Sequence, residues 1–165
     1  MSVLRAVLGG VLAFIPSCSK SPEQYPSSES MTTEELIMSF GDAPVGVSIG
    51  PIARSLSGRT VYVGTDQEGA AEAVKADRTK LRFMTAQDNE GNEWAYAYTT
   101  QAEFERLIPS ATPFIELGFT HFFEIVERDN RFRGIFVNAG SESSYPIPRE
   151  LFDDVKNALG ETDGG

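Results

Sequence analysis

A serine between two glycines is the first residue of this sequence that could do chemistry. Residues 46–50 read GVSIG, the pattern that many serine hydrolases place around their nucleophile, and His121 could act as the base. Such a nucleophile follows a buried strand and is followed directly by a helix. Pro44 and Pro51 bracket this stretch, so we expect Ser48 to lie in a glycine-rich connection or a short edge strand. A small serine hydrolase that uses Ser48 is the less favoured alternative.

Two scarce residue types exclude most metal and thiol chemistry. The chain has one cysteine, Cys18, and one histidine. It therefore cannot form a disulfide within one chain or build a zinc site from several cysteine and histidine ligands. No aspartate-rich loop has the spacing of a helix–loop–helix calcium site. The sequence predicts no catalytic residues, no metal and no cofactor, and we expect the protein not to be an enzyme.

The residues before Cys18 have the composition of an export signal. Arg5 gives a positive start, and residues 6–16 form an apolar run far shorter than the about 20 residues needed to span a bilayer. Residues 15–18, IPSC, resemble a bacterial lipobox, with an aliphatic residue three positions before the cysteine and a small residue directly before it. This resemblance implies that residues 1–17 are a lipoprotein signal peptide. It also implies lipidation of Cys18, which would anchor the protein to a membrane of the cell envelope.

The segment after Cys18 is rich in serine and proline and has too little apolar surface to fold by itself. We expect residues 18–31 to be a flexible tether. Three alternatives stay open. Translation could begin near Met31, which would give a cytoplasmic protein. The leader could instead form an ordinary buried helix, or it could be cleaved to release a free protein.

Net charge restricts the partners that the protein can bind. The chain has 14 Lys and Arg residues against 24 Asp and Glu residues, a formal charge of -10. Such a surface repels phosphate backbones and anionic lipid head groups. We therefore expect no nucleic-acid binding, and we expect membrane contact only through the lipid anchor.

The first half of the folded part shows four expected elements. A threonine cap, early glutamates and a glycine stop predict a helix over residues 32–41. An apolar run predicts a strand at residues 60–64, and an alanine- and glutamate-rich stretch indicates a helix over residues 66–76. Residues 81–86 and 93–98 alternate at period two around a loop rich in asparagine and glycine, which predicts a β-hairpin.

The second half continues to alternate between helices and strands. The expected elements are a helix that starts at a capping box at Thr100 and ends at Pro109, a helix with an aromatic stripe at residues 119, 122, 123 and 126, a strand at 132–137, a polar loop at 138–145 and a helix from Pro148 to Gly160. We expect one domain over residues 32–160 and a disordered tail at 161–165. The fold class is α/β (α+β), with a mixed β-sheet that contains a central hairpin and is covered by amphipathic helices.

Three aromatic residues share one face of the expected second hairpin strand: Trp94, Tyr96 and Tyr98. We expect this face to turn toward the core, because three large rings are too much apolar area to leave exposed. The alternative is an aromatic platform that contacts a partner.

A second possible interaction surface is formed by Asn138, Gly140 and Ser141, which follow an expected buried strand. Loops at the carboxyl ends of strands often hold ligands. The alternative, which we favour, is a turn in which the asparagine and a glycine adopt left-handed backbone angles.

Three stretches carry a resemblance to a known family. They are the strand that leads to Asp66, the turn AYTT at residues 97–100 and the stretch GIFVNAGS at residues 134–141. Together with the final helix, they make residues about 56–159 similar to the SseB N-terminal-domain family. Ala139 stands where that family tends to have proline. The resemblance implies an α/β domain that contacts other proteins and has no established active site, so no catalytic residue carries over.

These observations together predict a membrane-tethered lipoprotein with a non-enzymatic SseB-like interaction domain. The sequence does not identify the protein partner or the oligomeric state. The alternatives are a cytoplasmic accessory protein with the same fold that starts near Met31, and the hydrolase that would use Ser48.

Overall fold

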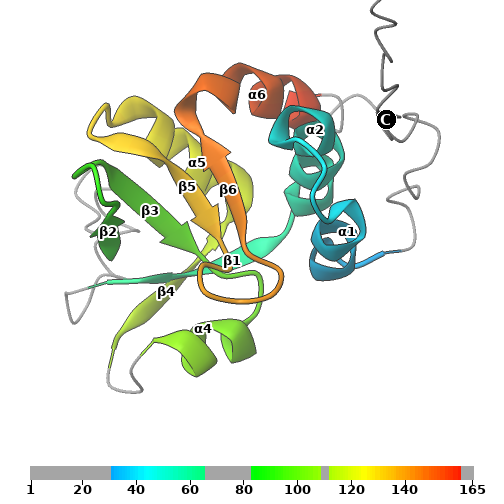
Figure 1. The fold of residues 1–165 in the computed structure, drawn as a ribbon. Coiled ribbons are helices and arrows are strands. Elements are labelled where there is room, and N and C mark those ends of the chain that lie inside the picture. The colour runs from blue at the N-terminus through cyan, green and yellow to red at the C-terminus, as the bar shows by residue number, and fades with distance from the viewer. Residues whose placement is uncertain (1–30, 66–82, 109–111, 161–165) are drawn as a thin grey trace, which may run out of the picture.

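A computed structural model describes the fold for residues 31–65, 83–108 and 112–160. Helices and strands are mixed along the chain (Figure 1), which gives the α+β fold that the sequence predicted. The elements are α1 (Thr33–Phe40), α2 (Val45–Leu56), β1 (Thr60–Gly64), β2 (Thr85–Gln87), β3 (Glu93–Ala97), α4 (Gln101–Leu107), β4 (Phe114–Gly118), α5 (Phe119–Arg128), β5 (Phe132–Val137), β6 (Tyr145–Pro148), the short 3-10 helix η4 (Arg149–Leu151) and α6 (Phe152–Gly160).

The described strands form two sheets. β1 and β4 pair antiparallel, and the other strands form a mixed sheet in the order β2-β3-β5-β6, in which β3 and β5 run parallel. A bridge between Tyr62 and Tyr98 links the two sheets. The predicted hairpin of β2 and β3 is confirmed, but it is not central, because β2 is an outer strand. The sequence predicted a single mixed sheet. It did not reveal β4, and β1 pairs with this strand in a separate two-stranded sheet.

Helices with strong local signals are confirmed. Thr32 caps α1, since its hydroxyl accepts from the Glu35 amide at 3.2 Å while the Glu35 carboxylate accepts from the Thr32 amide at 2.9 Å. Thr100 caps α4 by accepting from the Glu103 amide at 3.1 Å, but the second half of the predicted capping box is not formed, since the Glu103 carboxylate pairs with Arg106. The aromatic stripe of α5, formed by Phe119, Phe122 and Phe123 and continued by Val126, is buried throughout.

The expectation of a connection or edge strand around Ser48 is wrong, because this segment forms α2. Pro51 lies inside that helix and Pro44 caps its start. The buried side chains of α2 include Ile49, Ile52, Ala53 and Leu56, which recur at i, i+3, i+4 and i+7. Burial of this apolar stripe outweighs the local cost of proline and glycine in the helix.

The stretch after β5 also needs a correction. The polar loop ends at Ser144, because Tyr145–Pro148 pairs with β5 as strand β6. Pro148 is the last residue of this strand and caps η4, and α6 follows from Phe152. The final helix therefore starts later than the sequence predicted.

Arg149 ties the turn after β6 to the end of α5. Its guanidinium donates to four backbone carbonyl groups at 2.6–3.0 Å, those of Val126, Glu127, Asp129 and Phe132. It also lies over the Phe152 ring, 5.1 Å from the centroid. Because the last carbonyls of a helix have no partner within the helix, this contact stabilises the end of α5.

Helices cover one face of the larger sheet. The residues of this inner face are fully buried in a cluster with the apolar sides of α2, α5 and α6, and they are Ala95, Ala97, Ile135, Val137 and Ile147. Figure 1 shows α5 behind β5 and β6 and no labelled helix in front of these strands. The opposite face of the sheet is thus left open by the helices of the described part.

Several predicted segments lie outside the described residues: the signal peptide with Cys18, the tether up to residue 30, the helix at 66–76 and the tail at 161–165. Within residues 31–65, 83–108 and 112–160, no helix has the length and apolar character that a membrane span requires.

Candidate functional site

Ser48 makes a structural hydrogen bond. Its hydroxyl oxygen lies 2.6 Å from the Tyr145 hydroxyl oxygen and 3.2 Å from the Val45 carbonyl oxygen. Ser48 is 1% exposed and lies within α2, not on a turn between a strand and a helix. This geometry does not fit a hydrolase nucleophile, which must present its oxygen to a substrate.

His121 lies on α5 and does not contact Ser48. Its Nδ1 is 3.8 Å from a carboxylate oxygen of Glu124, and its side chain is 27% exposed. The histidine is thus partly exposed on the helix that carries the aromatic stripe. The structure thus does not bring the two residues of the alternative hydrolase together.

The predicted loop residues belong to a hydrogen-bonded turn. Asn138 has φ 50° and Gly140 has φ 85°, the left-handed backbone of the favoured interpretation. The Asn138 side chain is fully buried; it accepts from the Thr99 amide at 2.9 Å and donates to the Ser143 hydroxyl at 3.2 Å. Ser141 lies beside Ser143, with 3.0 Å between the two hydroxyl oxygens.

This turn joins the carboxyl ends of the two parallel strands. Thr99 follows β3 and Asn138 follows β5, and the Thr99 hydroxyl also donates to the Glu34 carboxylate of α1. The side-chain amide of Asn138 thus makes its hydrogen bonds to other residues of the protein. Among the three predicted surface residues, only Gly140 is exposed.

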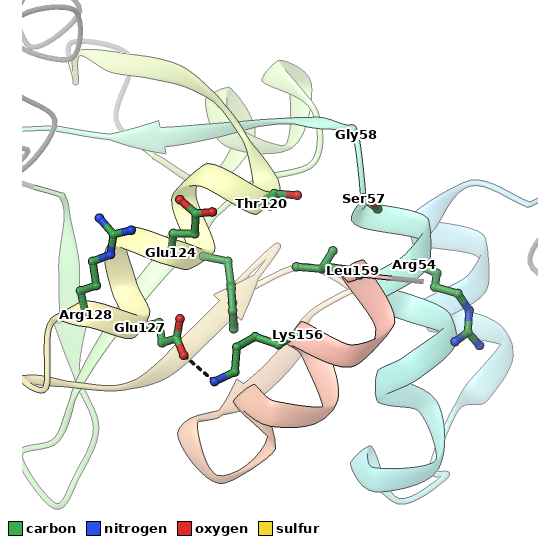
Figure 2. Close-up of a pocket in the computed structure, with 11 residues that line it drawn as sticks. Arg54, Ser57, Gly58, Thr120, Glu124, Glu127, Arg128, Lys156 and Leu159 are labelled. Atoms are coloured by element: carbon green, nitrogen blue, oxygen red, sulfur yellow. Dashed lines mark ion pairs between the residues drawn. The ribbon is translucent and has the colours of Figure 1, made fainter. Parts of the chain in front are cut away.

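A pocket of about 770 Å³ lies between α2, α5 and α6 (Figure 2). Lys156 Nζ lies 2.7 Å from Glu127 Oε1 and 2.7 Å from Asp153 Oδ1. Hydrogen bonds to Asp153 and Glu127 raise the pKa of Lys156, and these two carboxylates balance its positive charge. The described residues contain no cluster of three carboxylate, imidazole or thiol groups that could hold a metal ion. The pocket therefore shows no distinct ligand chemistry.

The open face of the larger sheet is aromatic, which corrects the expectation for the hairpin strand. Trp94 and Tyr96 are half-buried on this outer face, whereas Ala95 and Ala97 are the residues that face the core. The same core cluster holds the large phenylalanine rings of α5, and β3 contributes small side chains to it. The third ring, Tyr98, is buried as expected and packs against Phe104 at 5.6 Å.

The outer face is organised in two rows that run across three strands. Trp94 aligns with Gly134 and Pro148, and Tyr96 aligns with Phe136 and Pro146. Phe136 joins the rows, because its ring centroid lies 4.7 Å from that of Trp94 and 6.1 Å from that of Tyr96. We call Trp94, Tyr96, Phe136, Pro146 and Pro148 the aromatic face.

Trp94 is fixed on this face from several sides. Gly134 lies beneath its ring, and a Cβ atom at Gly134 would be 2.6 Å from Trp94 Cζ3. The indole Nε1 donates to Asp88 Oδ2 at 3.1 Å. Hydrogen bonds from Asn92 and Trp94 lower the pKa of Asp88 to about 2, so this carboxylate is charged at neutral pH.

The sequence analysis missed Phe136 and the two prolines of the aromatic face. The sequence placed Phe136 in a buried strand but did not indicate whether its ring lies on the inner or the outer face of the sheet. One available signal was the alternation of Tyr145, Pro146, Ile147 and Pro148, since prolines at period two are compatible only with an outer strand.

Comparison with protein families gives one match. The model described as SseB protein N-terminal domain matches residues 34–152, more than half of the chain. Comparisons with curated proteins and with solved structures found no match. The matched range runs from α1 to the first residue of α6 and includes the aromatic face. The chain belongs to the SseB N-terminal-domain family.

Proposed function

We propose that this protein is a membrane-tethered lipoprotein whose SseB-like domain binds another protein and catalyses no reaction. The apolar leader, the lipobox-like residues before Cys18 and the Ser/Pro-rich segment after it support the tether. The aromatic face supports the binding role. The anchor and the binding role can be tested separately.

The observation that carries the binding role is the partial exposure of Trp94, Tyr96 and Phe136 on one open sheet face. Aromatic side chains are enriched at protein interfaces, because they offer a large rigid contact area at low cost in conformational entropy. Trp94 is held by Gly134, Asp88 and Phe136 before any partner binds. Such preorganisation reduces the ordering cost of association.

The anchor is tested on the native protein by mass spectrometry of its amino terminus and by cell fractionation. We expect a chain that begins at Cys18 with fatty acyl groups and that enters the soluble fraction only with detergent. Cys18→Ser should release the protein from the membrane. A native chain that starts at Met31, or that keeps residues 1–17 unmodified, would contradict the anchor.

The binding role is tested by capture of partners from envelope extracts with wild-type and Trp94→Ala protein. The matched controls are Met38→Ala and Val47→Ala, which truncate exposed apolar side chains, 50% and 47% exposed, on α1 and α2. We expect a captured protein that is lost with Trp94→Ala and retained with both controls. Equal capture by all variants would contradict the role of the aromatic face.

The absence of hydrolase activity is tested with a fluorophosphonate probe, which reacts only with an activated serine. Because Ser48 is buried and hydrogen-bonded to Tyr145, we expect no labelling of the folded protein. Labelling that disappears in Ser48→Ala would restore the hydrolase alternative.

A further inference from the structure

We propose that the aromatic face binds an extended, proline-containing and positively charged segment of a partner protein. This inference rests on the proposed binding role and adds the chemistry of the partner. Three features of the described residues carry it: an outer strand with prolines at two of its four positions, a tyrosine hydroxyl in a continuous row of rings, and carboxylates at the turn next to Trp94.

The first feature disfavours binding by strand addition. β6 is an outer strand of the larger sheet, and Pro146 and Pro148 are two of its four residues. Both prolines occupy positions whose backbone faces away from β5, because a proline cannot donate into the ladder. At the opposite side, β2 is only three residues long. A partner is therefore recognised by side chains on the sheet face rather than by a continued ladder.

The second feature matches a segment with unpaired carbonyl groups. The Trp94, Phe136 and Tyr96 rings form a continuous row, and within the described structure the Tyr96 hydroxyl makes no hydrogen bond. A polyproline II segment has no internal hydrogen bonds and presents its carbonyls outward. Aromatic grooves bind such segments because the pyrrolidine rings pack on aromatic rings and the segment is already extended. Tyr96 supplies the donor and Trp94 supplies a ring surface.

The third feature sets the charge of the segment. Asn92 Nδ2 donates to Asp88 at 3.0 Å and to Glu90 at 3.3 Å, which places two carboxylates at the turn beside the Trp94 indole. No cationic side chain of the described residues pairs with either carboxylate. Arg131 is paired with Asp129, and Arg133 with Glu150. A basic residue next to the prolines would complement this turn and the net charge of -10.

The test uses synthetic peptides and the full-length chain. The probe is a short peptide with a run of prolines flanked by arginines; the controls replace the prolines with alanines or the arginines with glutamates. Trp94 is the only tryptophan in the chain, so its fluorescence reports on the aromatic face directly. We expect saturable binding of the probe and at least tenfold weaker binding of both control peptides.

Two conservative variants test the roles of individual groups without removing a ring. Tyr96→Phe removes the donor and should weaken probe binding about fivefold. Glu90→Gln should weaken it about twofold and reduce its salt dependence. Glu150→Gln is the matched control for Glu90→Gln, because it neutralises an exposed carboxylate paired with Arg133, and it should leave probe binding unchanged.

Equal binding of the alanine or glutamate peptide, or no effect of Tyr96→Phe, would overturn the proposal. If a captured partner still depends on Trp94 in that case, the binding role stands and only the partner chemistry fails.

Pro22→Ala combined with Pro26→Ala tests whether the chain's own proline-containing segment occupies the face. Tighter probe binding in that variant would show that this segment competes for the face, and it would overturn the proposal of an external partner. Self-association that Tyr96→Phe abolishes would instead identify a second copy as the occupant.

Discussion

The hydroxyl oxygens of Ser48 and Tyr145 lie 2.6 Å apart although 97 positions separate the two residues in the chain. Their contact joins α2 to β6. Both hydroxyl oxygens also lie 3.2 Å from the Val45 carbonyl oxygen, so one hydroxyl donates to that carbonyl and the other donates across the pair. A serine that resembles a nucleophile in the sequence thus holds a helix against the sheet.

We predict that Tyr145→Phe lowers the free energy of unfolding by about 1–2 kcal/mol, because it removes one hydroxyl from the hydrogen-bonded group of Ser48, Tyr145 and the Val45 carbonyl. Ser48→Ala should cost less, since alanine favours the helix. Denaturant unfolding of both single variants and the double variant measures the coupling, which should be about 1 kcal/mol. Strictly additive losses would contradict this hydrogen bond.

Stability should fall at high pH through two buried tyrosines. Burial raises the pKa of Tyr145 to about 12, and burial together with nearby Tyr96 and Glu103 raises the pKa of Tyr98 to about 12. In the unfolded chain these phenols ionise near pH 10. Their stabilising contribution is therefore complete below about pH 10 and is lost as the pH rises toward 12. Urea unfolding at a series of pH values should show a weaker decline in Tyr145→Phe.

Gly134→Ala should be strongly destabilising, by about 3 kcal/mol, because the new Cβ atom would lie 2.4 Å from the Ile147 carbonyl oxygen. Gly46→Ala in α2 is the matched control, since no atom lies within 4 Å of its Cβ position. That control should stabilise the protein by about 0.5 kcal/mol. Thermal unfolding of the two variants gives opposite shifts if the packing under Trp94 is correct.

Asn138 offers a way to separate backbone strain from lost hydrogen bonds. Asn138→Ala and Asn138→Gly both remove the side-chain bonds to Thr99 and Ser143. Glycine tolerates the φ of 50° better than alanine does. We predict that Asn138→Gly is more stable than Asn138→Ala by about 1 kcal/mol in urea unfolding. Equal stabilities would argue against the left-handed backbone at this position.

Arg149→Lys should lower the free energy of unfolding by about 2 kcal/mol, since one ammonium group cannot satisfy the four carbonyls that the guanidinium reaches. Arg133→Lys is the matched control, because the pair of Arg133 and Glu150 is exposed. The control should change stability by less than about 0.5 kcal/mol in the same urea titration. Similar effects of both variants would show that the carbonyl contacts of Arg149 contribute little.

Elements with local signals were predictable from the sequence. The cap of α1 at Thr32, the aromatic stripe of α5 and the hairpin of β2 and β3 all depend on residues within one element or turn. α2 was not predictable in the same way. Its proline and glycines favour a break locally, and only burial of its apolar stripe against the core decides for the helix.

The aromatic face depended on tertiary information. Period-two alternation places Trp94 and Tyr96 on one face of β3 but does not say which face meets the helices. The buried cluster settles this, because Ala95 and Ala97 lie in it together with the phenylalanine rings of α5. β4 escaped the sequence analysis because its partner β1 lies far back in the chain. β6 pairs with the preceding strand β5, but two of its four residues are prolines, which are typical of loops.

Pro146 and Pro148 also bear on how copies of this domain behave when many are crowded together. A flat outer strand with a full row of amide donors is a template for sheet growth from one molecule to the next. β6 lacks amide donors at two of its four positions, so it resists the edge-to-edge strand pairing that leads to fibrils. A domain with such a border offers neighbouring copies no ladder to extend at this edge.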